Sequence, residues 1–245
     1  MFDCTLTDGV ATITLDRPEA RNAVAVRHWR ELASLSEKIV GDDARAVVIA
    51  SAVPGIFSAG ADMTEFAELR DDADLRPEFR AAMRQGIEAV AALPMPVLAA
   101  VDGGCFGAAV ALTLACDIRI AGRDAIFATT PARLGLGYPR EDVARLLALV
   151  GRGVAGRMLL AGERLDARAA KRIGLAEAAD DDAVSAARAL ARIIADNDAG
   201  AVRLLKQTLA DPDDQALDPA FDGQFGTSGF ADRLDTFLNR RGGAR

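Results

Sequence analysis

The segment Phe57-Ser58-Ala59-Gly60-Ala61-Asp62-Met63 consists mainly of small residues and follows the apolar run 46–50. A strand that leads into small residues brings main-chain N–H groups close to whatever lies above it. Free N–H groups at a strand-to-helix turn can hold an oxyanion. The simpler alternative is a turn in which Asp62 caps the following helix. The segment therefore predicts a strand-to-helix junction and makes it a candidate anion-binding turn.

A second junction of the same kind lies fifty residues later, in Val101-Asp102-Gly103-Gly104-Cys105-Phe106-Gly107-Ala108-Ala109. It follows the apolar run 97–101, and small residues again stand where an N–H group must approach a ligand. Two such junctions after neighbouring parallel strands can converge on one point. The pair therefore predicts a single site made of main-chain donors.

The pattern of apolar residues predicts a mixed α/β fold. Strands are predicted over residues 5–7, 10–15, 46–50, 97–101, 118–121 and 125–127. Helices are predicted over 26–39, from 62, and over 79–93, 107–114, 143–149, 154–161 and 167–173, with an acidic loop over 69–77. This alternation is typical of parallel strands covered by helices. From residue 183 only helices are predicted, over 183–196, 199–209 and 230–240.

The overall composition excludes several classes of protein. The net charge of −7 argues against non-specific nucleic-acid binding, which requires a basic face. The apolar runs are too short to span a bilayer, so no membrane insertion is expected. One histidine and three scattered cysteines offer little for a metal site. The few cysteines and the absence of a basic-then-apolar leader pattern at the start favour a cytoplasmic location.

Five motifs occur in a fixed order along residues 10–175: DRPEARNA, FSAGADM, PMPVLAAVDGGCFGAA, ACDIRIA and ARLGLGY. In this order they resemble the crotonase, or enoyl-CoA hydratase/isomerase, superfamily. The later segment FADRLDTFLNRR, residues 230–241, is similar to the C-terminal signature of that superfamily.

The resemblance implies an α/β fold, a crotonase-like spiral of ββα turns with a C-terminal helical oligomerisation region. The expected division is a core over residues 1–182 and a helical trimerisation region over 183–245. It also implies a homotrimer or hexamer, and a substrate held as a CoA thioester without a prosthetic group.

Similarity assigns site residues as well. The two N–H groups that polarise the thioester carbonyl fall on Ala61 and Ala108. The adenine and pantetheine of CoA are expected against the residues of the first turn and the loop before it: Arg21, Ala59, Asp62 and Met63. The acidic segment 68–78 is expected to cap the acyl pocket.

The two glutamates that hydratases of this family use as general base and acid are absent. In an ungapped alignment their positions fall on Ala111 and Pro131, neither of which can transfer a proton. A family glycine whose N–H helps to hold the water falls near Pro139, which has no N–H. The resemblance therefore predicts thioester polarisation but leaves the proton-transfer step open.

Other groups can handle protons. Tyr138, the only tyrosine, ends a TPxxLGxxY pattern similar to that of methylmalonyl-CoA decarboxylases of the superfamily. Glu141 and Asp142 follow on the same segment, near where dehalogenase-type members carry a carboxylate. The simpler interpretations are a packed ring for Tyr138 and helix N-terminal charges for the two acids. His28 and Cys105 are expected to be structural.

Three functions remain open at this point. The first is an acyl-CoA enzyme of the hydratase/isomerase family that stabilises a thioester enolate, with Ala61, Ala108, Tyr138 and Glu141 as candidate catalytic residues. The second is a decarboxylase of malonyl-type thioesters that uses Tyr138. The third is a non-catalytic acyl-CoA binding protein.

Overall fold

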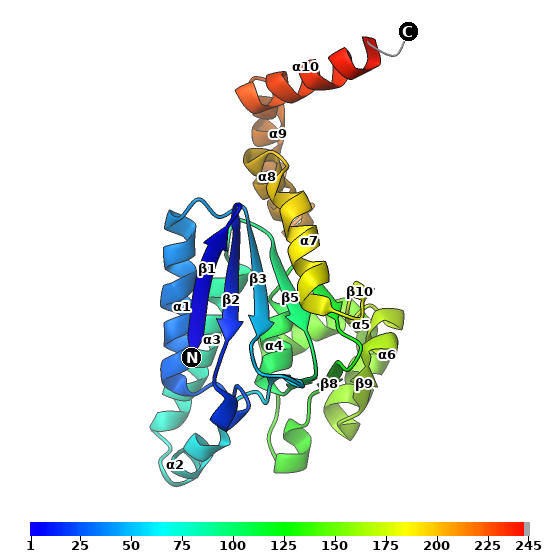
Figure 1. Cartoon of the computed structure of the whole chain (residues 1–245). Helices are drawn as coiled ribbons and strands as arrows, with labels where there is room; N and C mark the ends of the chain where they lie inside the picture. Colours follow the sequence, from blue (N-terminus) through cyan, green and yellow to red (C-terminus); the bar gives the residue numbers. More distant parts are fainter. Residues whose placement is uncertain (243–245) are drawn as a thin grey trace.

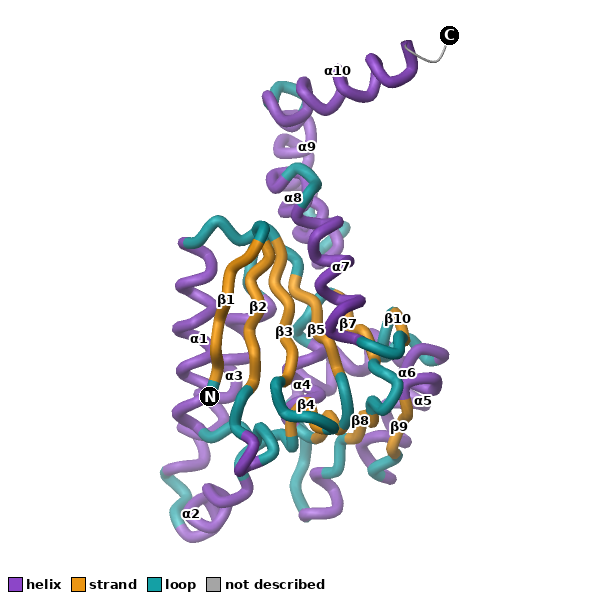
Figure 2. The backbone as a smooth tube through the Cα atoms, viewed as in Figure 1, coloured by secondary structure: helices purple, strands orange, loops and turns teal. Residues whose placement is uncertain are grey.

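The computed structural model describes residues 1–242, with side chains described through Asn239. Residues 243–245, the end of the predicted C-terminal region, lie outside the described part. The described chain forms a six-stranded sheet in the order β1-β2-β3-β5-β7-β10 and a four-stranded sheet in the order β4-β6-β8-β9. Figure 2 shows the larger sheet as a twisted layer of neighbouring strands.

The larger sheet is mostly parallel. β1 and β2 form an antiparallel hairpin, and every other neighbouring pair runs parallel. Asp8 and Gly9 both have positive φ at the hairpin turn, as a two-residue type I′ turn requires. The strands are β1 Phe2–Thr7, β2 Val10–Leu15, β3 Ala46–Ser51, β5 Val97–Val101, β7 Ile118–Ala121 and β10 Ala178–Ala179.

The smaller sheet is built from short strands that follow those of the larger one. β4, β6 and β8 pair in parallel, and β9 joins β8 antiparallel. Chain order β3–β4, β5–β6 and β7–β8 therefore alternates between the two sheets, which is the predicted spiral of ββα turns. These strands are β4 Ile56–Ser58, β6 Gly104–Phe106, β8 Ile126–Ala128 and β9 Arg164–Asp166.

Helices cover both faces of the larger sheet (Figure 1). On one face α1 and α3 pack together, and α1 buries Trp29 and Leu32. On the other face lies α7, which contacts β2, β3, β5 and β7. The helices are α1 Val26–Gly41, α2 Phe66–Asp71, α3 Leu75–Ala91, α4 Ala108–Leu114, α5 Arg140–Ala161, α6 Ala167–Arg172, α7 Ala183–Ala195, α8 Ala199–Ala210, α9 Asp218–Gln224 and α10 Ser228–Gly242.

The predicted acidic loop over 69–77 is wrong, because α2 continues to Asp71 and α3 begins at Leu75. Pro77 stands in the first turn of α3, where a backbone N–H has no intrahelical partner, so a proline is tolerated. Further along, the two helices predicted over 143–149 and 154–161 form one element, α5, with a break at Gly151 (φ 70°).

The C-terminal region is helical, as predicted. α8, α9 and α10 extend away from the two sheets as an arm (Figure 1). Lys206 of α8 holds the base of this arm to the core by donating to Asp117 Oδ2 at 2.8 Å and to Met95 O at 3.0 Å. A domain boundary at residue 183 stays a prediction. None of the helices within residues 1–242 combines the length and the apolarity that a membrane crossing requires.

The contact between α1 and α3 yields a stability prediction. A Cβ at Gly86 would lie 2.7 Å from Trp29 O and 3.0 Å from Trp29 Cε3, so Gly86→Ala forces the helices apart. We expect a loss of roughly 1–3 kcal/mol in the free energy of unfolding, measured by urea denaturation. Gly156→Ala in α5 is the matched control, because a Cβ there meets nothing within 4 Å. The control should be neutral or slightly stabilising, since alanine is the better helix former. Equal effects at both sites would contradict the packing argument.

Candidate active site

The two predicted junctions lie against each other. β4 and β6 pair in parallel, with Ile56 opposite Gly104 and Ser58 opposite Cys105. Just beyond β4, Gly60 has a φ of 92°, and a Cβ there would lie 3.0 Å from Ala108 N and 2.4 Å from Phe106 O. Only glycine allows so close an approach. The first turn therefore touches the start of α4, as the sequence predicted.

Each turn presents one main-chain donor. Around Ala61, the bridge to Val24 uses Gly60 O and Asp62 N and leaves the Ala61 N–H unused. Ala108 is the first residue of α4, where an N–H has no intrahelical acceptor. Gly107 before it adopts φ 52° and ψ −121°, a conformation open to glycine. Within residues 1–242, neither N–H donates to a protein acceptor. Two adjacent donors of this kind can share one oxygen atom.

A buried side-chain network holds the first turn in place. Asn22, whose φ is 55°, donates from Nδ2 to Ser51 Oγ at 2.8 Å and to Phe57 O at 3.0 Å. Its Oδ1 accepts from the N–H of Arg17 at 2.8 Å, and its carbonyl accepts from Ser58 Oγ at 2.6 Å. One amide thus connects the loop before α1 with the ends of β3 and β4.

Asp62 is buried within this turn. Its Oδ1 accepts from Thr64 N at 3.1 Å and thereby caps the short 3₁₀ helix Met63–Glu65, as the simpler interpretation predicted. Its Oδ2 accepts from Arg17 Nη1 at 2.7 Å. Burial raises the pKa of Asp62, but the hydrogen bonds from Arg17 and Thr64 outweigh it and lower the pKa from 3.8 to about 2. The carboxylate is therefore ionised and fully engaged within the protein.

The other residues predicted to bind CoA lie around the same turn. Arg21 is exposed, and its carbonyl accepts from the N–H of Ala59 at 3.0 Å. Met63 is half exposed immediately after Asp62. The structure therefore gathers Arg21, Ala59, Asp62 and Met63 beside the first turn, and their contact with CoA stays a prediction.

Tyr138 reaches the second turn. Its hydroxyl donates to Gly107 O at 2.9 Å, one residue before Ala108. Burial raises the pKa of Tyr138 well above 10.0, while the N–H of Ala111 donates toward the oxygen and acts the other way. The hydroxyl thus stays protonated at neutral pH. The hydroxyl is thus close to the backbone of Ala111, the position on which the family's first glutamate falls.

The two acids at the start of α5 differ sharply. Glu141 is 41% exposed and pairs with Arg140 at 2.8 Å. The side chain of Asp142 is fully buried and pairs with Arg84 of α3 at 2.9 Å. The candidate Glu141 therefore faces solvent, while its neighbour points inward. The helical spacing of Asp142 with buried Leu146 is the sequence signal that marks this inward face.

His28 and Cys105 are packed, as expected. His28 is buried, and its Nδ1 accepts from the N–H of Ala25 at 3.3 Å. Cys105 is fully buried, and burial raises the pKa of its thiol far above the usual value. Among the described residues no group of three or more histidine, cysteine or acidic side chains could hold a metal.

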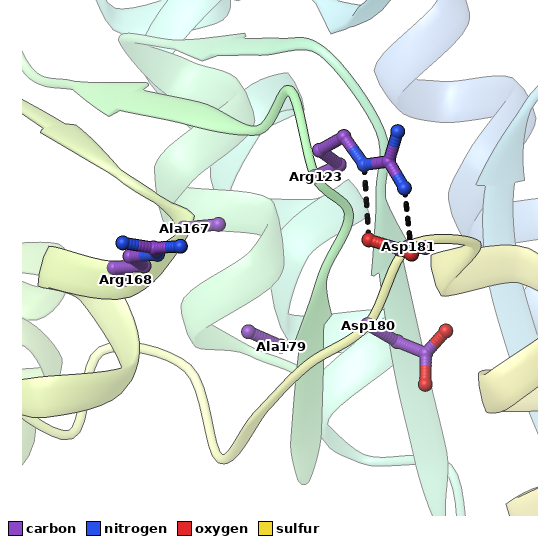
Figure 3. A pocket seen from close by; sticks show the side chains of 6 residues that line it. All are labelled: Arg123, Ala167, Arg168, Ala179, Asp180 and Asp181. Atoms are coloured by element: carbon purple, nitrogen blue, oxygen red, sulfur yellow. Dashed lines mark hydrogen bonds and ion pairs between the residues drawn. The ribbon is translucent and has the colours of Figure 1, made fainter.

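A cavity of about 530 Å³ lies away from the two turns, between the β7–β8 loop, the start of α6 and the segment after β10 (Figure 3). Arg123 and Asp181 pair across one side of it at 2.6 Å, and Arg168 lies on the other side. None of the predicted site residues lines this cavity.

The Asp62 ion pair gives a pH-dependent prediction. Because the pKa of Asp62 is lower in the folded protein than the usual 3.8, its contribution to stability is complete above about pH 5 and declines as the pH falls through 3.8 toward 2. We expect Asp62→Asn to cost roughly 2 kcal/mol in urea unfolding at pH 7 and distinctly less at pH 3. Asp71→Asn, which removes an exposed pair with Arg70, should change little at either pH. A cost for Asp62→Asn that does not vary with pH would contradict the assignment.

Comparison with known proteins identifies the family of the chain. Residues 5–226 match the sequence model of the family described as Enoyl-CoA hydratase/isomerase. The chain is 36% identical over 176 residues, 72% of its length and 69% of the relative's, to a Mycobacterium bovis protein named "Probable enoyl-CoA hydratase echA6". A putative enoyl-CoA hydratase/isomerase family protein from Hyphomonas neptunium is 31% identical, with a TM-score of 0.93 over 98% of this chain and 95% of that one. The enoyl-CoA hydratase of Bacillus anthracis is 29% identical, with a TM-score of 0.92 over 98% and 96%. The chain therefore belongs to the enoyl-CoA hydratase/isomerase family.

Proposed function

We propose that this protein is an acyl-CoA enzyme in which the N–H groups of Ala61 and Ala108 hold the thioester oxygen. The observation that supports the proposal is the approach of the first turn to the start of α4: a Cβ at Gly60, next to Ala61, would lie 3.0 Å from Ala108 N. Two oriented donors favour an enolate over the neutral carbonyl because the negative charge concentrates on the oxygen they bind. No prosthetic group is needed for this step, and CoA enters as part of the substrate.

The proposed CoA site lies on the outer side of the first turn. Arg21 is exposed there and has no ion pair among the described residues, so its charge is available to a phosphate. Ala59 and Met63 offer small and apolar surface beside it. Asp62 contributes to the CoA site indirectly, by holding the first turn in shape, because Arg17 and Thr64 already occupy both of its oxygens.

Hydration of an enoyl thioester is the first candidate reaction, since the curated relative of Mycobacterium bovis is named a probable enoyl-CoA hydratase. The residues that would serve it differ from the usual glutamates. Ala111 is fully buried in α4, and Pro131 begins the 3₁₀ helix Pro131–Leu134. Decarboxylation of a malonyl-type thioester is the second candidate. It is favoured by the Tyr138 hydroxyl at Gly107, because a neutral phenol there can give a proton to an enolate.

Ala108→Pro tests the role of the second donor. Proline is well tolerated at the first position of a helix, so this change removes the N–H with little cost to the fold. We expect kcat to fall by at least about 100-fold, as on loss of one oxyanion donor. Ala199→Pro, at the first position of α8, is the matched control and should keep full activity. Thermal unfolding of both variants verifies the fold, and unchanged turnover by Ala108→Pro would overturn the mechanism.

The activity is measured with a panel of enoyl-, 3-hydroxyacyl- and malonyl-type CoA thioesters, followed by mass spectrometry of the products. Gain or loss of one water supports the hydratase. Release of CO₂ that Tyr138→Phe abolishes selects the decarboxylase instead. Tight binding of thioesters without any turnover identifies a non-catalytic acyl-CoA binding protein and contradicts both enzymes.

We also propose a homotrimer or hexamer assembled through the C-terminal arm. Large apolar side chains are exposed along it: Leu205, Leu209, Phe221, Phe225, Phe237 and Leu238. Burying such a surface against another copy is strongly favourable in water. Light scattering at micromolar concentration should therefore give a mass of three or six chains. Truncation after Ala195 removes the arm and should abolish assembly, whereas a monomeric full-length chain would contradict the proposal.

A further inference from the structure

Five charged side chains meet between α3 and α5. Asp142 Oδ1 lies 2.9 Å from Arg84 Nη1 and 3.8 Å from Arg145 Nη1. Glu88 accepts from Arg145 Nη2 at 2.7 Å and forms an ion pair with Arg84, 2.9 Å from its Nε. Glu141 lies at the edge, 3.9 Å from Arg84 Nη1. Asp142 is the only one of the five whose side chain is fully buried.

Four buried atoms of this cluster are left without a hydrogen-bond partner among the described residues: one acceptor, Asp142 Oδ2, and three donors, Arg84 Nε, Arg84 Nη2 and Arg145 Nη1. Nearly all buried polar atoms in folded proteins are hydrogen-bonded, and an unpaired one costs about 1–3 kcal/mol, more if it is charged. Open donors and an open acceptor within one cluster indicate a ligand that both accepts and donates.

The ion pair lies next to the segment that carries Tyr138, because the N–H of Asp142 donates to Pro139 O at 3.1 Å. Asp142 raises the pKa of Tyr138 and Arg84 lowers it, so both charges act on the phenol. The Tyr138 hydroxyl in turn donates to Gly107 O, next to Ala108. α4 contacts both α3 and α5, and the ion pairs of Arg84 and Glu88 join α3 to α5. Tyr138 thus connects the ion pair to the second turn, beside the proposed thioester oxygen site.

The charges decide which ligand fits. Three carboxylates, Glu88, Glu141 and Asp142, surround two guanidinium groups, so a further anion would meet net repulsion. A carboxylate ligand would also leave Asp142 Oδ2 without a donor. A water molecule fits this pattern, since it can donate to Asp142 Oδ2 while accepting from one of the open guanidinium donors.

We propose that Arg84 and Asp142 bind the water that adds to an enoyl-CoA thioester, with Asp142 as the general base. This inference rests on the proposed hydratase function and supplies the groups that replace the two absent glutamates. The water oxygen bonds to Cβ of the C=C double bond while Asp142 Oδ2 takes one water proton. The π electrons form an enolate, whose oxygen the N–H groups of Ala61 and Ala108 hold. The enolate then takes the proton back from Asp142 at Cα, so that one water is added and Asp142 is regenerated.

The environment of Asp142 suits this role. Burial raises the pKa of the carboxyl, with Glu141 acting in the same direction, while Arg84 and Arg145 oppose the rise. A carboxylate whose pKa lies above the usual value of 3.8 is a stronger base once ionised and a better acceptor of a proton from water. Glu141, exposed and paired with Arg140, lacks this environment.

Asp142→Asn is the test, because it keeps the shape of the side chain and removes the base. With a short trans-2-enoyl-CoA, we expect kcat to fall by roughly 100-fold or more, as on loss of a general base. The Kd for a saturated acyl-CoA should stay within about twofold, since the proposed CoA and thioester contacts are made by the first turn and by Ala108. Glu163→Gln, which removes an exposed pair with Arg157, is the control and should keep wild-type kcat.

The outcomes separate the inference from the proposed function. Wild-type hydration that Asp142→Asn retains, while Ala108→Pro abolishes it, overturns the water site and leaves the thioester mechanism standing. Wild-type binding without hydration of any enoyl thioester overturns the water site together with the hydratase. A variant that is less stable but has normal kcat in its folded fraction shows a purely structural ion pair and also overturns the inference.

A second measurement does not depend on folding of the variant. The wild-type kcat should decline on the acid side with an apparent pKa above the usual aspartate range, because Asp142 must be ionised to accept a proton. The charged groups that face Asp142 are Arg84 and Glu88 of α3 and Glu141 and Arg145 of α5, with Tyr138 on the preceding loop. Circular dichroism across the same pH range confirms that the fold is intact. A kcat that stays level down to pH 4 would overturn the assignment.

Discussion

The geometry of the site depends on one buried amide. The side chain of Asn22 donates to groups at the ends of β3 and β4, and its own backbone adopts a left-handed conformation. Asparagine reaches this conformation at lower cost than most residues. In a dry interior each of these hydrogen bonds is strong, and each would leave an unpaired group if lost. The position of Ala61 relative to Ala108 therefore follows from how Asn22 is satisfied, several residues away from either donor.

Both strand-to-helix junctions could be predicted from sequence because each needs small residues within one short segment. A glycine or alanine at a strand end shows where a backbone approaches another chain segment, and Gly60 meets Ala108 as expected. Of the short strands only β8 was predicted, and β4, β6, β9 and β10 were not, since two or three residues are too few for alternation to be a dependable signal. The charged stretch around residue 72 has the composition of a loop, but packing of α3 on α1 and of Phe66 in α2 on Phe79 in α3 extends the helices into it.

The proton-handling groups were only partly predictable. The sequence named Tyr138 and Glu141, and the structure places the tyrosine hydroxyl at Gly107. The importance of Asp142 depends on Arg84, which lies 58 residues earlier and on another helix. No local pattern reveals such a partner, because ion pairing across helices is set by how α3 and α5 pack. The absence of both family glutamates can therefore be read from the sequence, whereas the pairing of Arg84 with Asp142 cannot.

The alanines of α7 have a mechanical consequence for the arm. Ala183, Ala187, Ala191 and Ala195 recur every fourth residue and are buried against the large sheet. Their small side chains let the helix axis approach the strands closely, so α7 has little freedom to roll about its axis. A turn of one residue, about 100°, would drive larger side chains into the sheet. Since α8 to α10 continue from α7, this close packing fixes the direction in which the arm leaves the sheet. A larger side chain at one of these four alanines would push α7 away from the strands and shift the position of the arm.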